Sequence, residues 1–182
     1  KIALLMSIPA AIGLSMLSIP LISLIYQHGL FTELNTAVVA KTLIAFSIGL
    51  PAFVLIKIYL PIFYSLGDTE NPFKYSLIAI AANIILGIFL FPIYGVIGLA
   101  ISTSFSSWIN FFLLINRSNK LKISVFSTNF NFNLLKIIFA SIFMAFSIHI
   151  CSSLLFDISL FLFVISLILT GIFIYFLILF LL

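Results

Sequence analysis

Apolar runs of about eighteen residues or more recur along the whole chain, and they constrain its fold more than any other feature. A helix needs about 20 mostly apolar residues to cross the hydrocarbon core of a bilayer. In that core only helices and closed barrels satisfy their backbone, and these runs lack the alternation of barrel strands. The chain is 64% hydrophobic and only 7% charged. The sequence therefore predicts an all-α polytopic membrane protein.

Short polar segments divide the chain into about six predicted transmembrane helices. We expect these helices at residues 2–26, 37–64, 73–91, 96–115, 134–156 and 158–182. They group into four helices over residues 1–116, a basic connection over 117–133, and two further helices over 134–182. The chain has no initiator Met and ends on "FLILFLL". We interpret it as a piece of a longer protein or a truncated copy.

The positive charges predict the orientation in the membrane. The 117–133 connection carries Arg117, Lys120 and Lys122, and basic residues favour the cytoplasmic side of the inner membrane. Alternation of the helices then places the C-terminus on the cytoplasmic side and Asp157 outside. The net charge of +4 is spread thinly among apolar runs, so we expect a lipid bilayer and no nucleic acid as a partner.

No constellation of catalytic residues is present. The chain has no Gly-rich phosphate loop, no HExxH and no Ser/His/Asp set, so we expect no enzyme. Because Cys151 is the single cysteine, an internal disulfide and a clustered thiolate metal site are both excluded. The sequence therefore predicts no metal and no cofactor. All four acidic residues fall in predicted loops, so these spans supply no carboxylate for ion coupling at membrane depth: Glu33, Asp68, Glu70 and Asp157.

Lys57 is the only charge well inside a predicted span. It lies about seven residues, or roughly 10 Å, from the inner end of its helix. One interpretation is that its aliphatic stem snorkels and keeps the ammonium at the headgroups. The other is that it faces a water-filled cavity and pairs with an anionic group of a substrate. The position of Lys57 in the sequence does not decide between these two interpretations.

Prolines interrupt the first two predicted helices, at Pro9, Pro20, Pro51 and Pro61. Each removes a backbone hydrogen bond and bends its helix. Bent helices line the paths of transporters, although proline is also commoner in membrane helices in general. Because Lys57 lies between two of these prolines, the pattern favours a cavity wall with hinges.

Small residues recur at every fourth position of the fourth predicted helix, at Gly98, Ser102 and Ser106. Such a stripe lets another helix approach closely, so we favour packing over substrate contact. Asn83 and Asn110 suggest interhelical hydrogen bonds. Trp108 is interpreted as ordinary filling between helices or against lipid.

The junction after the second predicted helix has the composition of a rigid elbow. Gly67 can adopt a left-handed conformation that ends a helix, and Pro72 suits the first turn of the next one. Asp68 and Glu70 are expected before that helix start, where the helix dipole stabilises negative charge.

Three stretches resemble the MurJ/MviN family of lipid II flippases: "LIYQHGLFT" (24–32), "LIAFSIGLPAFVLIKIYLPIFYSLGDTENP" (43–72) and "YGVIGLAISTSFSSWIN" (94–110). This family belongs to a wider superfamily of multidrug, oligosaccharidyl-lipid and polysaccharide exporters. The resemblance covers roughly residues 1–122. It implies a two-lobed bundle of fourteen helices, of which this chain would be helices nine to fourteen.

The resemblance also implies a function. A lipid II flippase moves the undecaprenyl-pyrophosphate-linked peptidoglycan precursor to the outer leaflet by alternating access, for cell-wall synthesis. Its partners would be lipid II, the bilayer and the N-terminal lobe that this chain lacks. Lys57 is the one residue carried over as a cavity cation, whereas Glu70 stands where the family usually has a basic residue.

Two alternatives remain at this point. A related exporter would carry another polyprenyl-linked glycan or a drug. A cation exporter should have acidic residues in its spans, and none lies there, so a polyanionic lipid fits better. A non-transporting membrane scaffold or a remnant is the second alternative.

Overall fold

The computed structural model describes residues 2–121, 130–154 and 159–181, and the regular elements within them are helices. Five are long and apolar enough to cross a membrane, and α1 with α2 forms a candidate sixth span that is bent. The predicted all-α membrane fold is confirmed. The helices are α1 (Ile2–Met16), α2 (Ser18–Tyr26), α3 (Glu33–Ser65), α4 (Glu70–Tyr94), α5 (Val96–Lys120), α6 (Phe130–Leu154) and α7 (Leu160–Leu181).

The first predicted helix is broken in the structure. Instead of one helix over 2–26, α1 and α2 meet at a bend of 70°. Pro20 lies in the first turn of α2. Its nitrogen cannot donate to the Met16 carbonyl, and its ring crowds that carbonyl, which accounts for the break. Pro9, by contrast, lies within the continuous α1.

Several helices are longer than predicted. α5 runs to Lys120 and α6 begins at Phe130, so both ends of the expected 117–133 connection are helical. The reason is that a helix can continue past the hydrocarbon region with polar side chains exposed to water. Residues 122–129 and Asp157 lie outside the described part of the chain.

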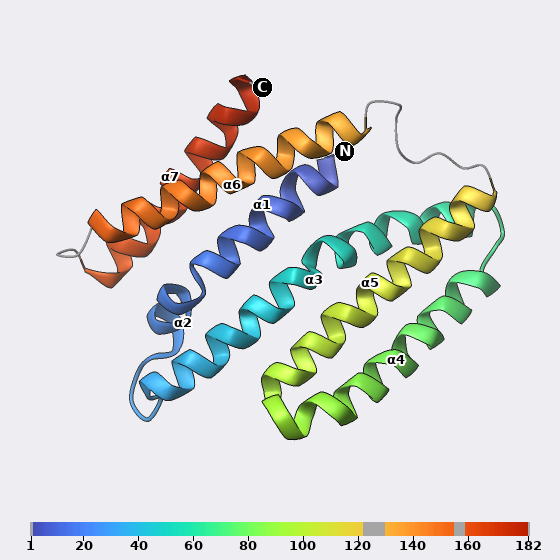
Figure 1. Ribbon diagram of the computed structural model, residues 1–182, viewed down its shortest axis with the longest axis horizontal. Coiled ribbons are helices and arrows are strands. Elements are labelled where there is room, and N and C mark those ends of the chain that lie inside the picture. The colour runs from blue at the N-terminus through green and yellow to red at the C-terminus, as the bar shows by residue number, and fades with distance from the viewer. Residues whose placement is uncertain (1, 122–129, 155–158, 182) are drawn as a thin grey trace.

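Figure 1 shows the order of the helices across the molecule: α6 and α7 lie on one side, α1 is next, and α3, α5 and α4 follow. Two buried clusters hold this arrangement together. The first joins α1, α3 and α5 and includes Leu4, Tyr59 and Phe111. The second joins α6 and α7 to Leu17, which lies between α1 and α2, and it includes Met144 of α6. Leu5 and Ile12 of α1 pack against it. α1 therefore belongs to both cores.

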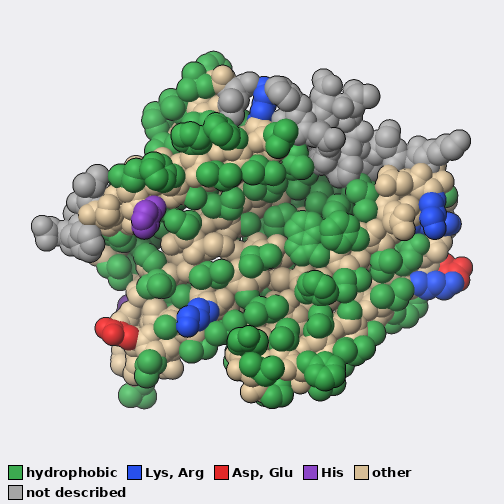
Figure 2. Space-filling model, viewed as in Figure 1, with side chains coloured by type: hydrophobic (Ala, Val, Ile, Leu, Met, Phe, Trp, Pro, Cys, Tyr) green, Lys and Arg blue, Asp and Glu red, His purple; other side chains and the backbone are tan. Residues whose placement is uncertain are grey.

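A hydrogen bond adds to the second core, because the Tyr175 hydroxyl of α7 donates to the Leu5 carbonyl of α1 at 2.7 Å. Apolar side chains cover most of the visible face of the bundle, and the few charged side chains in view lie toward its edges (Figure 2). Such a surface suits contact with lipid.

Candidate functional site

Lys57 projects from α3 between Pro51 and Pro61, and its side chain is exposed. Leu55 and Tyr59, two positions away on either side, are buried in the first core. At 100° per residue, Lys57 therefore lies on the face of α3 that points away from this core. The structure leaves the ammonium exposed on the outside of the described bundle.

The length of α3 gives the depth of Lys57. With 33 residues it spans about 50 Å, whereas the hydrocarbon core is only about 30 Å thick. A centred α3 would extend about 10 Å beyond the core at each end. Lys57 lies about 12 Å from the end at Ser65, which places it near the edge of the hydrocarbon. From there the ammonium can reach the headgroups.

The segment of α3 before Pro51 is held by two side chains of α5. Ser104 Oγ donates to the Ala45 carbonyl at 2.6 Å, and Trp108 Nε1 donates to the Ile48 carbonyl at 3.0 Å. Trp108 also packs against the first core, which agrees with its interpretation as filling between helices, and the hydrogen bond is a further role. Its indole N–H supplies a directed bond beside the point where proline removes a donor from the helix.

α3 and α5 approach very closely at the same place. A Cβ atom added to Gly49 would lie 2.7 Å from Ser104 Oγ and 2.9 Å from Ser104 Cα. Such distances leave room for glycine alone, so the two backbones pack almost in contact. Sequence reasoning missed this residue, because the stripe it followed runs along α5 only.

The predicted stripe of small residues on α5 is buried along its length, at Gly98, Ser102 and Ser106. A Cβ on Gly98 would lie 2.5 Å from the Leu90 carbonyl oxygen of α4. A Cβ on Gly87 of α4 would lie 3.7 Å from Ser102 Oγ. These positions support a packing role between α4 and α5.

The two asparagines differ. Thr103 Oγ1 on α5 donates to Asn83 Oδ1 on α4 at 3.5 Å, which is an interhelical hydrogen bond at the long limit. Asn110 Oδ1 is buried without a hydrogen-bond partner. The interhelical bond expected for Asn110 is therefore not made at this atom.

The prediction for the elbow between α3 and α4 is confirmed for Gly67 and Pro72 and wrong for Glu70. Gly67 has φ of +74° and follows the end of α3, which confirms the left-handed prediction. Pro72 lies in the first turn of α4. Glu70 is the first residue of α4 rather than a residue before it, and it forms an ion pair with Lys74.

Asp68 ties this elbow to the end of α5. Its carboxylate accepts hydrogen bonds from Asn71 Nδ2 at 2.8 Å and Asn71 N at 3.2 Å, and lies 3.6 Å from Arg117 Nη2. The hydrogen bonds from Asn71, followed by the charge of Arg117, hold the pKa of Asp68 below its usual value. The carboxylate is therefore ionised at neutral pH. Sequence reasoning missed this pair, because the two partners belong to different predicted segments.

Within the described ranges, no group of three or more His, Cys, Asp or Glu side chains is placed to hold a metal ion. Five of the described helices are of membrane length. Internal prolines flank a lysine in α3, and a charged elbow joins α3 to α4. These features define a multi-pass helical membrane protein with the bent helices typical of transporters.

A family profile described as "Lipid II flippase MurJ" matches residues 1–173. The chain therefore belongs to the MurJ family of lipid II flippases, as the resemblance indicated.

Relatives and a solved structure agree with this assignment. The "Probable lipid II flippase MurJ" of Rickettsia prowazekii (strain Madrid E) is 42% identical over 120 residues, covering 66% of this chain and 24% of that protein. The protein of the same description from Rhizobium tropici is 41% identical over 110 residues, covering 60% and 21%. That from Buchnera aphidicola subsp. Baizongia pistaciae (strain Bp) is 37% identical over 145 residues, covering 79% and 28%.

A solved structure described as "Lipid II flippase MurJ, inward closed conformation" matches with a TM-score of 0.81 and 32% identity. The match covers 96% of this chain and 35% of that one. The chain thus spans roughly a quarter of the curated relatives (24%, 21% and 28%) and about a third of the solved structure.

Proposed function

We propose that this chain forms most of the second lobe of a lipid II flippase, together with its two additional helices. In this proposal the complete protein moves lipid II from the inner to the outer leaflet by alternating access, for cell-wall synthesis. The observation that carries it is the match of 96% of the chain to a MurJ structure at a TM-score of 0.81. The first lobe, which would complete the two-lobed bundle, corresponds to the part of the relatives that this chain does not cover.

The chemistry of the substrate explains why such a protein needs a cavity rather than a catalytic centre. A pyrophosphate carries negative charge, and an isolated charge is very costly to move into hydrocarbon. A hydrated path with a cation beside it lowers that cost without breaking any covalent bond. We therefore assign this chain a transport role and no reaction.

Lys57 is our candidate for that cation, at the cytoplasmic mouth of the path. Its exposed position on α3 and its depth near the hydrocarbon edge support this role. Pro9, Pro20, Pro51 and Pro61 would allow α1, α2 and α3 to bend as the lobes alternate. The contacts of Ser104 and Trp108 with α3 would keep α3 and α5 moving as one unit.

The experiment that tests the function uses the complete gene product. We expect it to restore growth and cell shape to bacteria depleted of their native lipid II flippase, and to raise the amount of lipid II labelled at the outer leaflet. An unrelated multi-pass protein at equal abundance serves as the control. Stable expression in the membrane without any rescue would contradict lipid II flipping and favour another polyprenyl-linked cargo or a scaffold.

We also propose that the end of α5, the 117–133 connection and the C-terminus face the cytoplasm. Arg117 and Lys120 in the last turn of α5 support this orientation. Cysteine labelling checks it, after Cys151, the single native cysteine, is replaced by serine. We expect a membrane-impermeant thiol reagent to label Leu30→Cys in intact cells, because Leu30 is 98% exposed between α2 and α3. Asn119→Cys should react only after the cells are opened, and the reverse pattern would overturn the orientation.

A further inference from the structure

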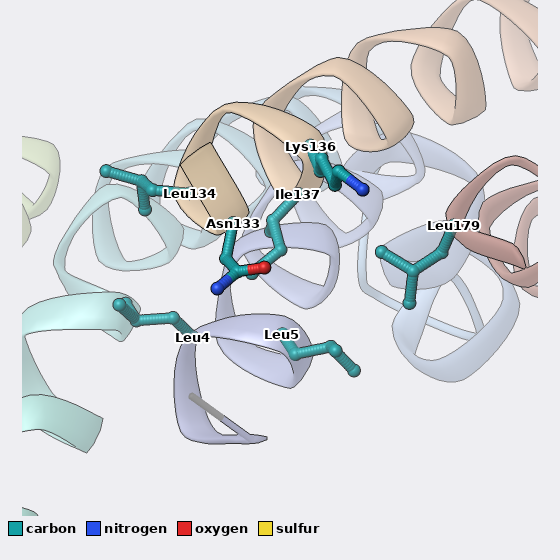
Figure 3. A pocket seen from close by; sticks show the side chains of 7 residues that line it. All are labelled: Leu4, Leu5, Asn133, Leu134, Lys136, Ile137 and Leu179. Carbon is teal, nitrogen blue, oxygen red and sulfur yellow. The ribbon is translucent and has the colours of Figure 1, made fainter. Parts of the chain in front are cut away.

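A pocket of about 270 Å³ lies where the starts of α1 and α6 meet the end of α7. Figure 3 shows the seven side chains that line it: Leu4, Leu5, Asn133, Leu134, Lys136, Ile137 and Leu179. Five are apolar and two are polar. The side chain of Asn133 points from α6 toward the space between Leu4 and Leu5, and Lys136 extends along α6 on the side of Leu179. The pocket therefore combines apolar walls with a polar, basic rim.

The electrostatics of this pocket favour an anion. None of the lining residues within the described part of the chain is acidic, and half-buried Lys136 brings a positive charge. α1 and α6 both begin here, and the first turns of helices present unpaired N–H groups and the positive end of the dipole. α7 ends here and adds the negative end of one helix dipole against the positive ends of two. Asn133 and Lys136 each have an interaction within the protein, but an ammonium has three donors and can also hold a phosphate oxygen.

We propose that this pocket binds the headgroup of an anionic phospholipid from the adjacent leaflet. The phosphate would lie against Lys136 and Asn133, and the first part of an acyl chain would contact Leu5 and Leu179. Basic pockets between transmembrane helices on the cytoplasmic side are a recurring form of lipid recognition. The site is separate from Lys57, which lies on α3, and it does not depend on which lipid-linked substrate is transported.

The size and the walls of the pocket favour a phospholipid over other anions. Sites for whole small ligands have volumes of roughly 300–1,000 Å³, so this one holds a headgroup and leaves the acyl chains in the bilayer. Inorganic phosphate would gain nothing from the leucine walls. A phospholipid matches both the basic rim and the apolar walls of the pocket, because its charged headgroup and its acyl chains are adjacent.

The test is to titrate the complete gene product, in mild detergent, with phosphatidylglycerol or with phosphatidylethanolamine of the same acyl chains. Native mass spectrometry then counts the bound lipids. We expect phosphatidylglycerol to bind the wild type several-fold more tightly, and Lys136→Gln to weaken it about fivefold, the effect of about one basic residue at a charged surface. Phosphatidylethanolamine should respond little to this substitution.

Matched variants distinguish a built site from general surface charge. Lys120→Gln removes one charge from an exposed position at the end of α5, outside the pocket, and should keep the preference for phosphatidylglycerol. Lys136→Arg should retain most of the binding, which separates loss of charge from misfolding. The proposal is overturned if Lys136→Gln keeps the preference or if Lys120→Gln loses it equally. Displacement of phosphatidylglycerol by stoichiometric lipid II would also overturn it, since the pocket would then be a substrate site.

Discussion

Replacing Gly98 with alanine should destabilise the protein by about 2 kcal/mol, within the usual cost of overpacking. The added Cβ would lie 2.5 Å from the Leu90 carbonyl oxygen and 2.7 Å from its carbon. Both contacts are backbone atoms of α4, so no side-chain rotation relieves them. Alanine normally favours a helix over glycine by up to about 1 kcal/mol, and the clash outweighs this gain. The measurement is the thermal midpoint of the complete gene product in detergent.

Gly13→Ala is the matched control for this prediction. Gly13 also lies inside a helix, but the nearest atom to its added Cβ is the flexible Met144 Cε at 3.9 Å. This variant should melt at the wild-type temperature or slightly above it. Equal midpoints for Gly98→Ala and Gly13→Ala would show that α4 can move away from α5 at little cost.

Lys57→Ala should abolish the rescue of cells depleted of their native flippase while leaving the protein level and thermal midpoint nearly unchanged. The side chain is exposed and lies outside both cores, so its removal leaves no cavity. Under the proposed function, the loss would come from the missing positive charge beside the pyrophosphate. Growth after depletion, with membrane abundance measured in the same cells, checks the result.

Two further variants make the Lys57 prediction specific. Lys41 is exposed on the same helix nearer its other end, and Lys41→Ala should rescue growth fully. Lys57→Arg keeps the charge and should rescue at least in part. Full rescue by Lys57→Ala would assign this lysine to snorkelling at the membrane surface.

The helical type and the approximate number of membrane spans could be predicted, because apolar length alone decides them. The sequence predicted a bend at Pro20, but not that it would divide the span into two helices, α1 and α2. A proline can be accommodated within a helix, as Pro9 is, or it can break one, and the choice depends on packing around it. Several helix ends were also missed. The hydrophobic pattern stops at the hydrocarbon boundary, whereas a helix can continue beyond it into water.

The contacts that connect segments distant in sequence could not be predicted from one chain. The ion pair of Asp68 with Arg117 joins the elbow to α5, and the hydrogen bond from Trp108 to the Ile48 carbonyl joins α5 to α3. Local rules describe caps and turns, so they found Gly67 and Pro72 in the elbow. The position of Lys57 in its helix was readable, but the direction of its side chain required the packing of α3 against α5.

The membership of α1 in both cores affects how firmly the last two helices are attached. Lipid tails are as apolar as leucine, so exposing one side of α1 to the bilayer would sacrifice little hydrophobic free energy. The attachment of α6 and α7 then depends on shape fit and on polar contacts such as the bond from Tyr175 to the Leu5 carbonyl. The affinity of α6 and α7 for the rest of the bundle can therefore be adjusted by single side chains.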